Sequence, residues 1–159
     1  MKAGTNRRDF FSRTGAAALA LAVCVLGLPA SAAEDRIFTG LVDGVAVGGY
    51  DAVAYFKQNK PVRGKAEITA EFGGATWRFA STDNRDAFVG DPKRYAPQYG
   101  GYCSWAVANG YTAKGDPNAW RIVDGKLYLN YSKGVQRRWA KDIPGNISKA
   151  EANWPDVLN

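Results

Sequence analysis

The chain contains no histidine. Histidine is the usual general acid or base near neutral pH and a common metal ligand, so its absence excludes Ser-His and Cys-His catalytic pairs. It also excludes the zinc, haem and blue-copper sites that need an imidazole. Sulfur is scarce as well, because the chain has only Met1, Cys24 and Cys103. Any chemistry must therefore use these groups, carboxylates, tyrosines, lysines or the backbone.

The N-terminal region, residues 1–32, has the features of an export signal. Arg7 and Arg8 are followed by apolar residues, a pattern close to the twin-arginine motif. An uncharged run over residues 15–28 is shorter than the roughly 20 residues that span a bilayer, and the Ala-Ser-Ala at 30–32 is a small-residue cleavage site. We therefore expect a twin-arginine-type signal peptide cleaved near Ala32, a periplasmic location, and no membrane span after the signal is removed.

Cleavage would also change the charge and the thiol content. The mature chain would keep 17 Lys and Arg against 14 Asp and Glu, a net charge of +3 spread along the chain. This balance gives no reason to expect nucleic-acid binding. Cys24 would leave with the signal, so Cys103 would be the one remaining thiol and no intramolecular disulfide could form. The densest basic patch has helical spacing and is interpreted as a solvated helix face; it contains Lys133, Arg137, Arg138 and Lys141.

Local patterns predict an α+β domain with two β-hairpins and several short helices. Apolar and polar residues alternate on both sides of Gly73-Gly74, and predicted strands also flank Asp124-Gly125. Both dipeptides favour tight hairpin turns. Residues with helix-capping side chains follow each hairpin. We find no internal repeat, and we expect the two hairpins to form one small antiparallel sheet. The predicted elements are a strand or helical turn at 50–56, a hairpin at 67–80, helices at 82–89, 92–96 and 102–108, a hairpin at 119–131, and helices at 133–142 and 144–154. Around them we expect an N-terminal arm at 33–43, a domain at 44–155 and a C-terminal tail at 156–159.

Several motifs of the central region resemble those of exported YHS-domain proteins of bacteria. They are GYDAVAYF at 49–56, TWRFAS at 76–81, NRDAF at 84–88, DPKRY at 91–95, YGGYC at 99–103, GDP at 115–117 and DGKLYLNY at 124–131. The resemblance covers most of residues 44–155 and implies a YHS-like α+β fold. It also implies kinship with small metal-binding modules, in which a Cys or His follows the first hairpin and a second Cys lies a few residues on. The matching positions here are Ala80 and, approximately, Asn84, which do not suit a soft metal, so the metal site does not transfer.

Cys103 has two interpretations. A buried cysteine at the start of a helix can fill space among Tyr99, Tyr102 and Trp105. The same position could instead lower the pKa of the thiol through the helix dipole and nearby backbone N–H groups. A thiolate could then bind Cu(I), form a mixed disulfide, or join two chains in a homodimer. We favour the packed thiol and predict no cofactor, with copper as the metal that the second interpretation allows.

Asp51 also has two interpretations. Its carboxylate could bind a cation or polarise a ligand, or it could cap a short helix or turn over Val53 and Ala54, which we favour. Five tyrosines are numerous enough to line a cleft, although clustered aromatics usually form core; they are Tyr99, Tyr102, Tyr111, Tyr128 and Tyr131.

The sequence thus predicts an exported YHS-domain protein that is a non-enzymatic module binding a small ligand or a periplasmic protein. The candidate ligand-binding residues are Asp51, Tyr99, Tyr102, Cys103 and Trp105. We identify no catalytic residue. The alternative is a copper or thiol-redox accessory protein that acts through Cys103.

Overall fold

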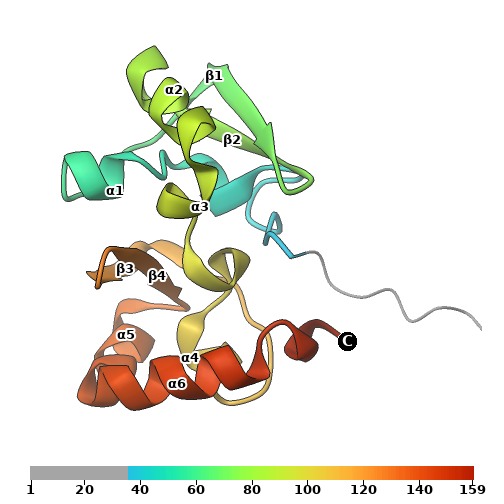
Figure 1. The fold of residues 1–159 in the computed structure, drawn as a ribbon, viewed down its shortest axis with the longest axis vertical. Helices are drawn as coiled ribbons and strands as arrows, with labels where there is room; N and C mark the ends of the chain where they lie inside the picture. Colours follow the sequence, from blue (N-terminus) through green and yellow to red (C-terminus); the bar gives the residue numbers. More distant parts are fainter. Residues whose placement is uncertain (1–35) are drawn as a thin grey trace, which may run out of the picture. The chain divides into compact units, whose positions relative to one another are not determined.

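The computed structural model describes residues 36–159, which contain two β-hairpins, each with short helices before and after it (Figure 1). The predicted signal peptide and the first residues of the predicted arm lie outside the described residues. None of the helices within 36–159 is long and apolar enough to cross a membrane.

The hairpins form where the turn signals predict them. Strand β1 (Lys65–Phe72) pairs antiparallel with β2 (Ala75–Phe79), and β3 (Asp116–Val123) pairs antiparallel with β4 (Lys126–Asn130). All four turn residues have a positive φ, including Asp124 at 50°, as tight primed turns require. The predicted α+β class is confirmed.

The expected single sheet is wrong, because the hairpins form two separate two-stranded sheets. Other segments make bridges to the two return strands. Val45 makes a parallel bridge to Thr76 on β2, and Cys103 makes a parallel bridge to Leu129 on β4. The hairpins therefore meet through side chains and not through a shared hydrogen-bonded edge.

The helices that follow the hairpins begin at the predicted capping residues, and the longest helix begins at Asp142, which was predicted to end the preceding helix. The side chains of Ser81, Asp91, Ser132 and Asp142 each accept a hydrogen bond from the backbone N–H three residues on. The helical elements are η1 (Ala46–Gly49), α1 (Ala54–Lys57), α2 (Thr82–Gly90), α3 (Pro92–Tyr95), η2 (Gln98–Gly101), α4 (Ser104–Ala108), α5 (Lys133–Trp139), η3 (Ala140–Asp142), α6 (Ile143–Asn153) and η4 (Asp156–Leu158). The helix predicted at 102–108 starts later because Cys103 is extended, with φ −62° and ψ 115°.

The described chain contains an internal structural repeat, which corrects our expectation of none. The order η1, α1, β1, β2, α2, α3 is followed by η2, α4, β3, β4, α5 and then η3 with α6. Both hairpins carry an irregularity at the same place, near the start of the first strand. We call residues 45–95 the first half and residues 98–153 the second half.

The start of each half shows the repeat most clearly. Three consecutive residues have positive φ in each: Val47, Gly48 and Gly49 at 52°, 58° and 80°, and the segment 99–101 at 54°, 60° and 88°. A tyrosine in extended conformation follows in both cases. The next residue is Asp51 in the first half and Cys103 in the second.

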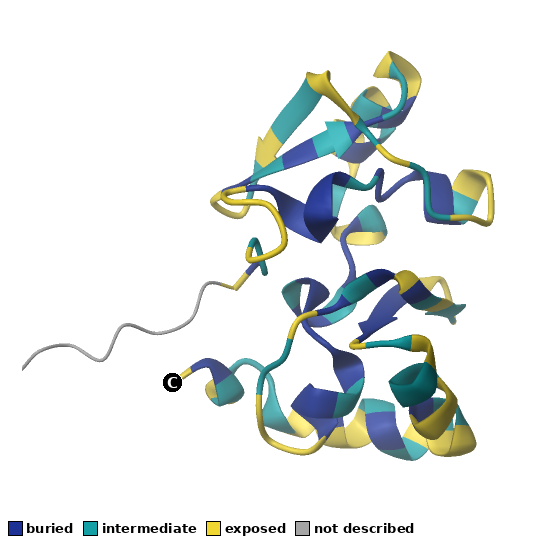
Figure 2. Ribbon diagram, turned by 180° about the vertical axis from the view of Figure 1, so that it is seen from behind, coloured by how far each residue is buried: buried dark blue, intermediate teal, exposed yellow. Residues whose placement is uncertain are grey.

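Each half has an aromatic core, and the two cores are joined. Phe88 of α2 and Trp139 of α5 hold the same place in their halves, and both are almost completely buried. Buried residues are concentrated on β2 and β4 (Figure 2). Leu129 of β4 belongs to the cluster of the first half. The Tyr55 hydroxyl donates a hydrogen bond to the Pro117 carbonyl oxygen at 2.8 Å, which ties α1 to β3.

Candidate functional site

Cys103 lies at the junction of α4, β4 and the loop that precedes β3. Its N–H donates to the Ala113 carbonyl oxygen at 2.8 Å, and its sulfur accepts the Tyr131 N–H at 3.2 Å. Its thiol lies 3.9 Å from Oδ1 of Asn130, to which it donates a long hydrogen bond. The side chain is 1 % exposed.

Burial decides the ionisation of this thiol. Desolvation raises the pKa of Cys103, and the backbone N–H groups of Ala106, Tyr131 and Trp105 lower it by less. The thiol is therefore neutral near pH 7. This is the behaviour expected of a packed cysteine, and it opposes an activated thiolate. A disulfide to a second chain would also need a sulfur at the surface.

Asp51 occupies the corresponding position in the first half and is a structural cap. Its Oδ1 accepts the N–H groups of Val53 at 2.9 Å and Ala54 at 3.2 Å. Its Oδ2 accepts the Ala80 N–H at 2.8 Å and the Asn84 side-chain amide at 2.7 Å. The carboxylate is fully buried and has two acceptor bonds on each oxygen. The predicted cap over Val53 and Ala54 is confirmed.

The two halves thus place different side chains, Asp51 and Cys103, beside backbone N–H groups of equivalent residues. In the first half, the donors to Asp51 are the N–H groups of residues 53, 54 and 80. In the second half, the Tyr131 N–H donates to the Cys103 sulfur, the N–H groups of residues 105 and 106 lower the pKa of the thiol, and the Trp105 N–H donates to Oδ1 of Asn130 at 3.3 Å. Asp51 thereby links α1 to Ala80, the residue after the first hairpin, and Cys103 at the start of α4 is bonded to Tyr131, the residue after the second. Cys103 therefore has the structural role that Asp51 has in the first half.

Tyr99 and Tyr102 lie in the core of the second half and not beside Asp51. The Tyr99 ring packs 6.0 Å from Tyr128 and 5.9 Å from Trp154, and burial raises the pKa of its hydroxyl. The Tyr102 ring lies 5.2 Å from Phe38 and 6.0 Å from Trp154. The five candidate ligand residues therefore do not form one cluster. Only Cys103 and Trp105 of the five belong to the cavity described next.

A cavity of about 250 Å³ lies over Cys103. It is bounded by α4, the loop after α4, the residue after β4, and α5. Its walls are mainly apolar and aromatic, and its only charged side chain is that of Arg138. The lining residues are Cys103, Trp105, Ala106, Tyr111, Ala113, Tyr131, Val135 and Arg138. Tyr111 and Tyr131 are each about half exposed, so the cavity has an aromatic rim.

The halves differ at the position that bounds this cavity. In the first half, Asn84 on α2 donates to Asp51 and so fills the space beside the carboxylate. The corresponding residue of α5 is Val135, which lines the cavity and makes no hydrogen bond to Cys103. The second half therefore keeps open space where the first half has a polar contact.

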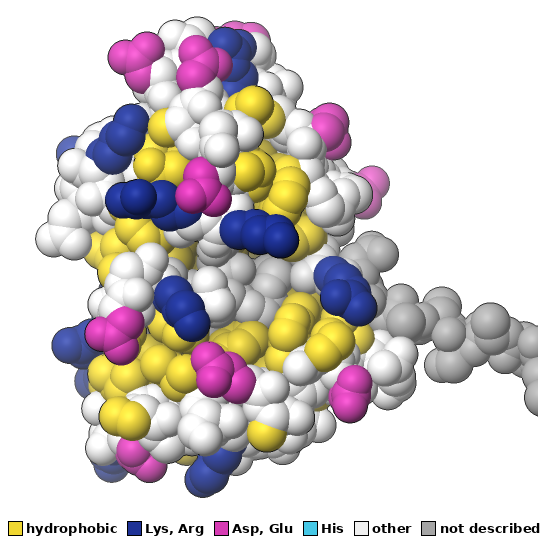
Figure 3. Space-filling view, viewed as in Figure 1, with side chains coloured by type: hydrophobic (Ala, Val, Ile, Leu, Met, Phe, Trp, Pro, Cys, Tyr) yellow, Lys and Arg dark blue, Asp and Glu magenta, His cyan; other side chains and the backbone are white. Residues whose placement is uncertain are grey.

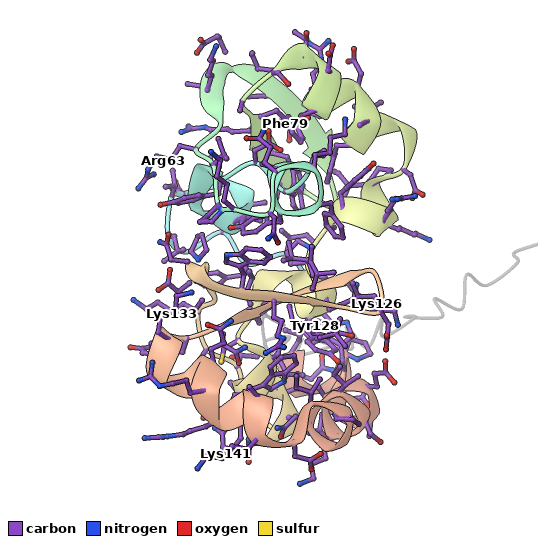
Figure 4. All side chains as sticks on the ribbon, turned by 90° about the vertical axis from the view of Figure 1, so that its left-hand side faces the viewer. Arg63, Phe79, Lys126, Tyr128, Lys133 and Lys141 are labelled. Atoms are coloured by element: carbon purple, nitrogen blue, oxygen red, sulfur yellow. The ribbon has the colours of Figure 1, made fainter. Side chains whose placement is uncertain are left out.

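A second hollow of about 460 Å³ adjoins the first and shares Trp105 and Arg138 with it. Its remaining lining residues are Lys141, Asp142, Asn146 and Lys149. Lys141 and Lys133 reach the surface, whereas Tyr128 points into the second half (Figure 4). All four residues of the predicted basic patch are exposed, as predicted, and two of them, Arg138 and Lys141, also line these hollows.

Tyr111 and Tyr131 were among the tyrosines considered for a cleft, but sequence reasoning missed Ala106, Ala113, Val135 and Arg138 as cavity residues. Val135 and Arg138 are three positions apart on α5, which places them on neighbouring turns. That spacing was a usable signal. Nothing in the sequence brings the loop at 111–113 to the same place, because its position depends on the backbone bond between Ala113 and Cys103.

The described residues do not fit a metal centre within one chain. Residues 36–159 contain no group of three or more His, Cys, Asp and Glu side chains placed to hold a metal ion. Copper(I) prefers soft sulfur ligands, and Cys103 is the only cysteine of this region and has no second sulfur beside it. Copper binding through Cys103 stays a prediction that would need a second chain.

Comparison with protein-family models, with characterised proteins and with solved structures gives no match to this chain. The resemblance to YHS-domain proteins therefore depends on the motifs quoted above.

Proposed function

We propose that this chain is an exported, YHS-like binding protein that holds a small organic ligand in the cavity over Cys103. The observation that carries the proposal is the cavity itself, with aromatic walls and one cationic side chain. Small-molecule sites are typically concave and mostly apolar, with a few polar groups that orient the ligand. The neutral, buried thiol then forms part of the apolar wall and is no reacting group.

The surface charge supports a small ligand over a nucleic acid. Basic and acidic side chains are interspersed over the face drawn in Figure 3, with apolar surface between them. Proteins that bind a nucleic-acid backbone usually present a continuous basic patch or stripe.

Filling the cavity tests the proposed site. Amide chemical shifts of the purified chain are recorded during titration with a panel of single-ring compounds, both neutral and charged. We expect saturable shifts at Ala113 and Tyr131, and their loss in a Val135→Phe variant. Val89→Phe is the matched control, because Val89 lies on α2 and is 59 % exposed. Saturable binding that is equal in both variants, or no binding by any compound, would refute the proposed site.

Copper titration tests the alternative role of Cys103. If the thiol is packed, Cu(I) binding is the same in the unmodified chain and in Cys103→Ser. A stoichiometric site that disappears in Cys103→Ser would establish the metal role instead.

The export proposal depends on residues 1–32 and is tested separately. Cell fractionation should place the chain in the periplasm, and N-terminal sequencing should start near Ala33.

A further inference from the structure

Arg138 carries a positive charge that no described side chain compensates. Within residues 36–159 the ion pairs are Arg85 with Asp86 and Lys126 with Glu151, and neither involves Arg138. Arg138 is exposed to solvent and lines both the cavity over Cys103 and the hollow beside it. An arginine between two cavities without a protein partner is available to bind a ligand.

The charges around Arg138 are mostly of the same sign. Lys141 and Lys149 line the adjoining hollow, and Asp142 is the only acidic residue there. One oxygen of Asp142 is engaged, because it accepts the Gly145 N–H at 3.0 Å as the cap of α6. Three cations and one carboxylate leave a local excess of positive charge, which favours an anionic ligand.

The size and walls of the cavity limit the rest of the ligand. A volume of about 250 Å³ exceeds the roughly 150 Å³ of a cavity that holds benzene, and it is below the roughly 300–1,000 Å³ of sites for drug-sized molecules. Trp105, Tyr111 and Tyr131 line it with aromatic rings, and the Lys114 ammonium lies over one face of the Tyr131 ring, 5.2 Å from its centroid. The space therefore suits one ring with a short substituent.

From these observations we infer that the cavity binds a single-ring aromatic carboxylate, with the ring against Trp105, Tyr111 and Tyr131 and the carboxylate on Arg138. This inference rests on the proposed function and specifies the ligand class of that same site. A guanidinium matches a carboxylate through two parallel N–H···O bonds, which an uncharged amide cannot reproduce.

The experiment compares benzoate with benzamide, which has nearly the same shape and no charge. Amide shifts at Ala113 and Tyr131 report binding to the unmodified chain, Arg138→Gln and Arg137→Gln. Arg137 is the matched control, because it is adjacent on α5 and does not line either cavity. We expect benzoate to bind more tightly than benzamide, and Arg138→Gln to weaken benzoate roughly ten- to a hundredfold, as loss of a charge-assisted hydrogen bond predicts. Arg137→Gln should change it less than about threefold, through screened long-range charge alone.

Two results would overturn the inference in distinguishable ways. If benzamide and benzoate bind equally, and Arg138→Gln has no effect on either, the ligand is not selected as an anion, although the proposed cavity still binds ligands. If neither compound binds and the wider panel also fails, the inference falls together with the proposed function. Equal weakening by Arg137→Gln and Arg138→Gln would assign the effect to overall charge and also refute the role of Arg138.

Discussion

Replacing Asp51 by alanine should destabilise the protein far more than the equivalent replacement of Cys103. The two residues hold the same position in the two halves, and both are buried. Asp51 accepts four hydrogen bonds between 2.7 and 3.2 Å, from three backbone N–H groups and the Asn84 amide. The weakly polar sulfur of Cys103 accepts the Tyr131 N–H at 3.2 Å.

The difference can be estimated from the donors that each variant leaves without an acceptor. The Ala54 N–H also donates to the Asp51 carbonyl oxygen at 3.2 Å, so Asp51→Ala leaves three donors without an acceptor. A buried donor that loses its partner costs about 1–3 kcal/mol, so three donors at about 1.5 kcal/mol each give about 4.5 kcal/mol for Asp51→Ala. Cys103→Ala removes one sulfur and weak hydrogen bonds, for which about 1–2 kcal/mol is expected. Since domains of this size are stable by about 5–15 kcal/mol, Asp51→Ala should bring the protein close to unfolding.

Urea unfolding followed by tryptophan fluorescence measures both free energies, because Trp77 and Trp139 are buried and report the loss of both cores. We expect Asp51→Ala to lose at least 2 kcal/mol more than Cys103→Ala, the difference between the two estimates. If the two variants lie within about 1 kcal/mol of each other, the argument from unsatisfied donors is wrong.

Two further predictions follow from the structure and one from the sequence of residues 1–32. Cys103 in the folded chain should react with a thiol reagent at pH 7 more slowly than in urea, because burial raises the pKa of the thiol, and equal labelling rates would contradict this slower reaction. The free energy of unfolding should also fall as the pH rises above the usual thiol pKa, since the thiol of the unfolded chain ionises first. Phe88→Ala and Trp139→Ala should each cost about 3–5 kcal/mol in urea unfolding, and a loss below about 1 kcal/mol in either would show that the cores of the two halves are not equivalent. Lysine at both Arg7 and Arg8 should keep the precursor in the cytoplasm, as measured by fractionation, and unchanged export would rule out the twin-arginine route.

Many local elements could be predicted because their causes are local. Gly73-Gly74 and Asp124-Gly125 provide the positive φ values that tight turns require, and Ser81 and Ser132 bond the backbone three residues away. The cap role of Asp51 over the next residues was predictable for the same reason.

The repeat leaves only short traces in the sequence, Gly-Gly-Tyr at 48–50 and 100–102 and the capping serines Ser81 and Ser132, because the halves share backbone geometry and few other side chains. Asp51 corresponds to Cys103, and Asn84 corresponds to Val135, so equivalent positions of the two halves carry chemically different side chains. The separation of the hairpins into two sheets also depends on distant contacts, such as the bridge from Cys103 to Leu129.

The sequence by itself determined which chemistries are excluded, where the chain turns and where its helices begin, because these depend on residue type and on neighbours a few positions away. The tertiary structure alone decided that Tyr99 and Tyr102 belong to the core and that Arg138 shares a cavity with Cys103. It also decided the ionisation of Cys103, since desolvation depends on every group packed around the sulfur and exceeds the local effect of three N–H groups.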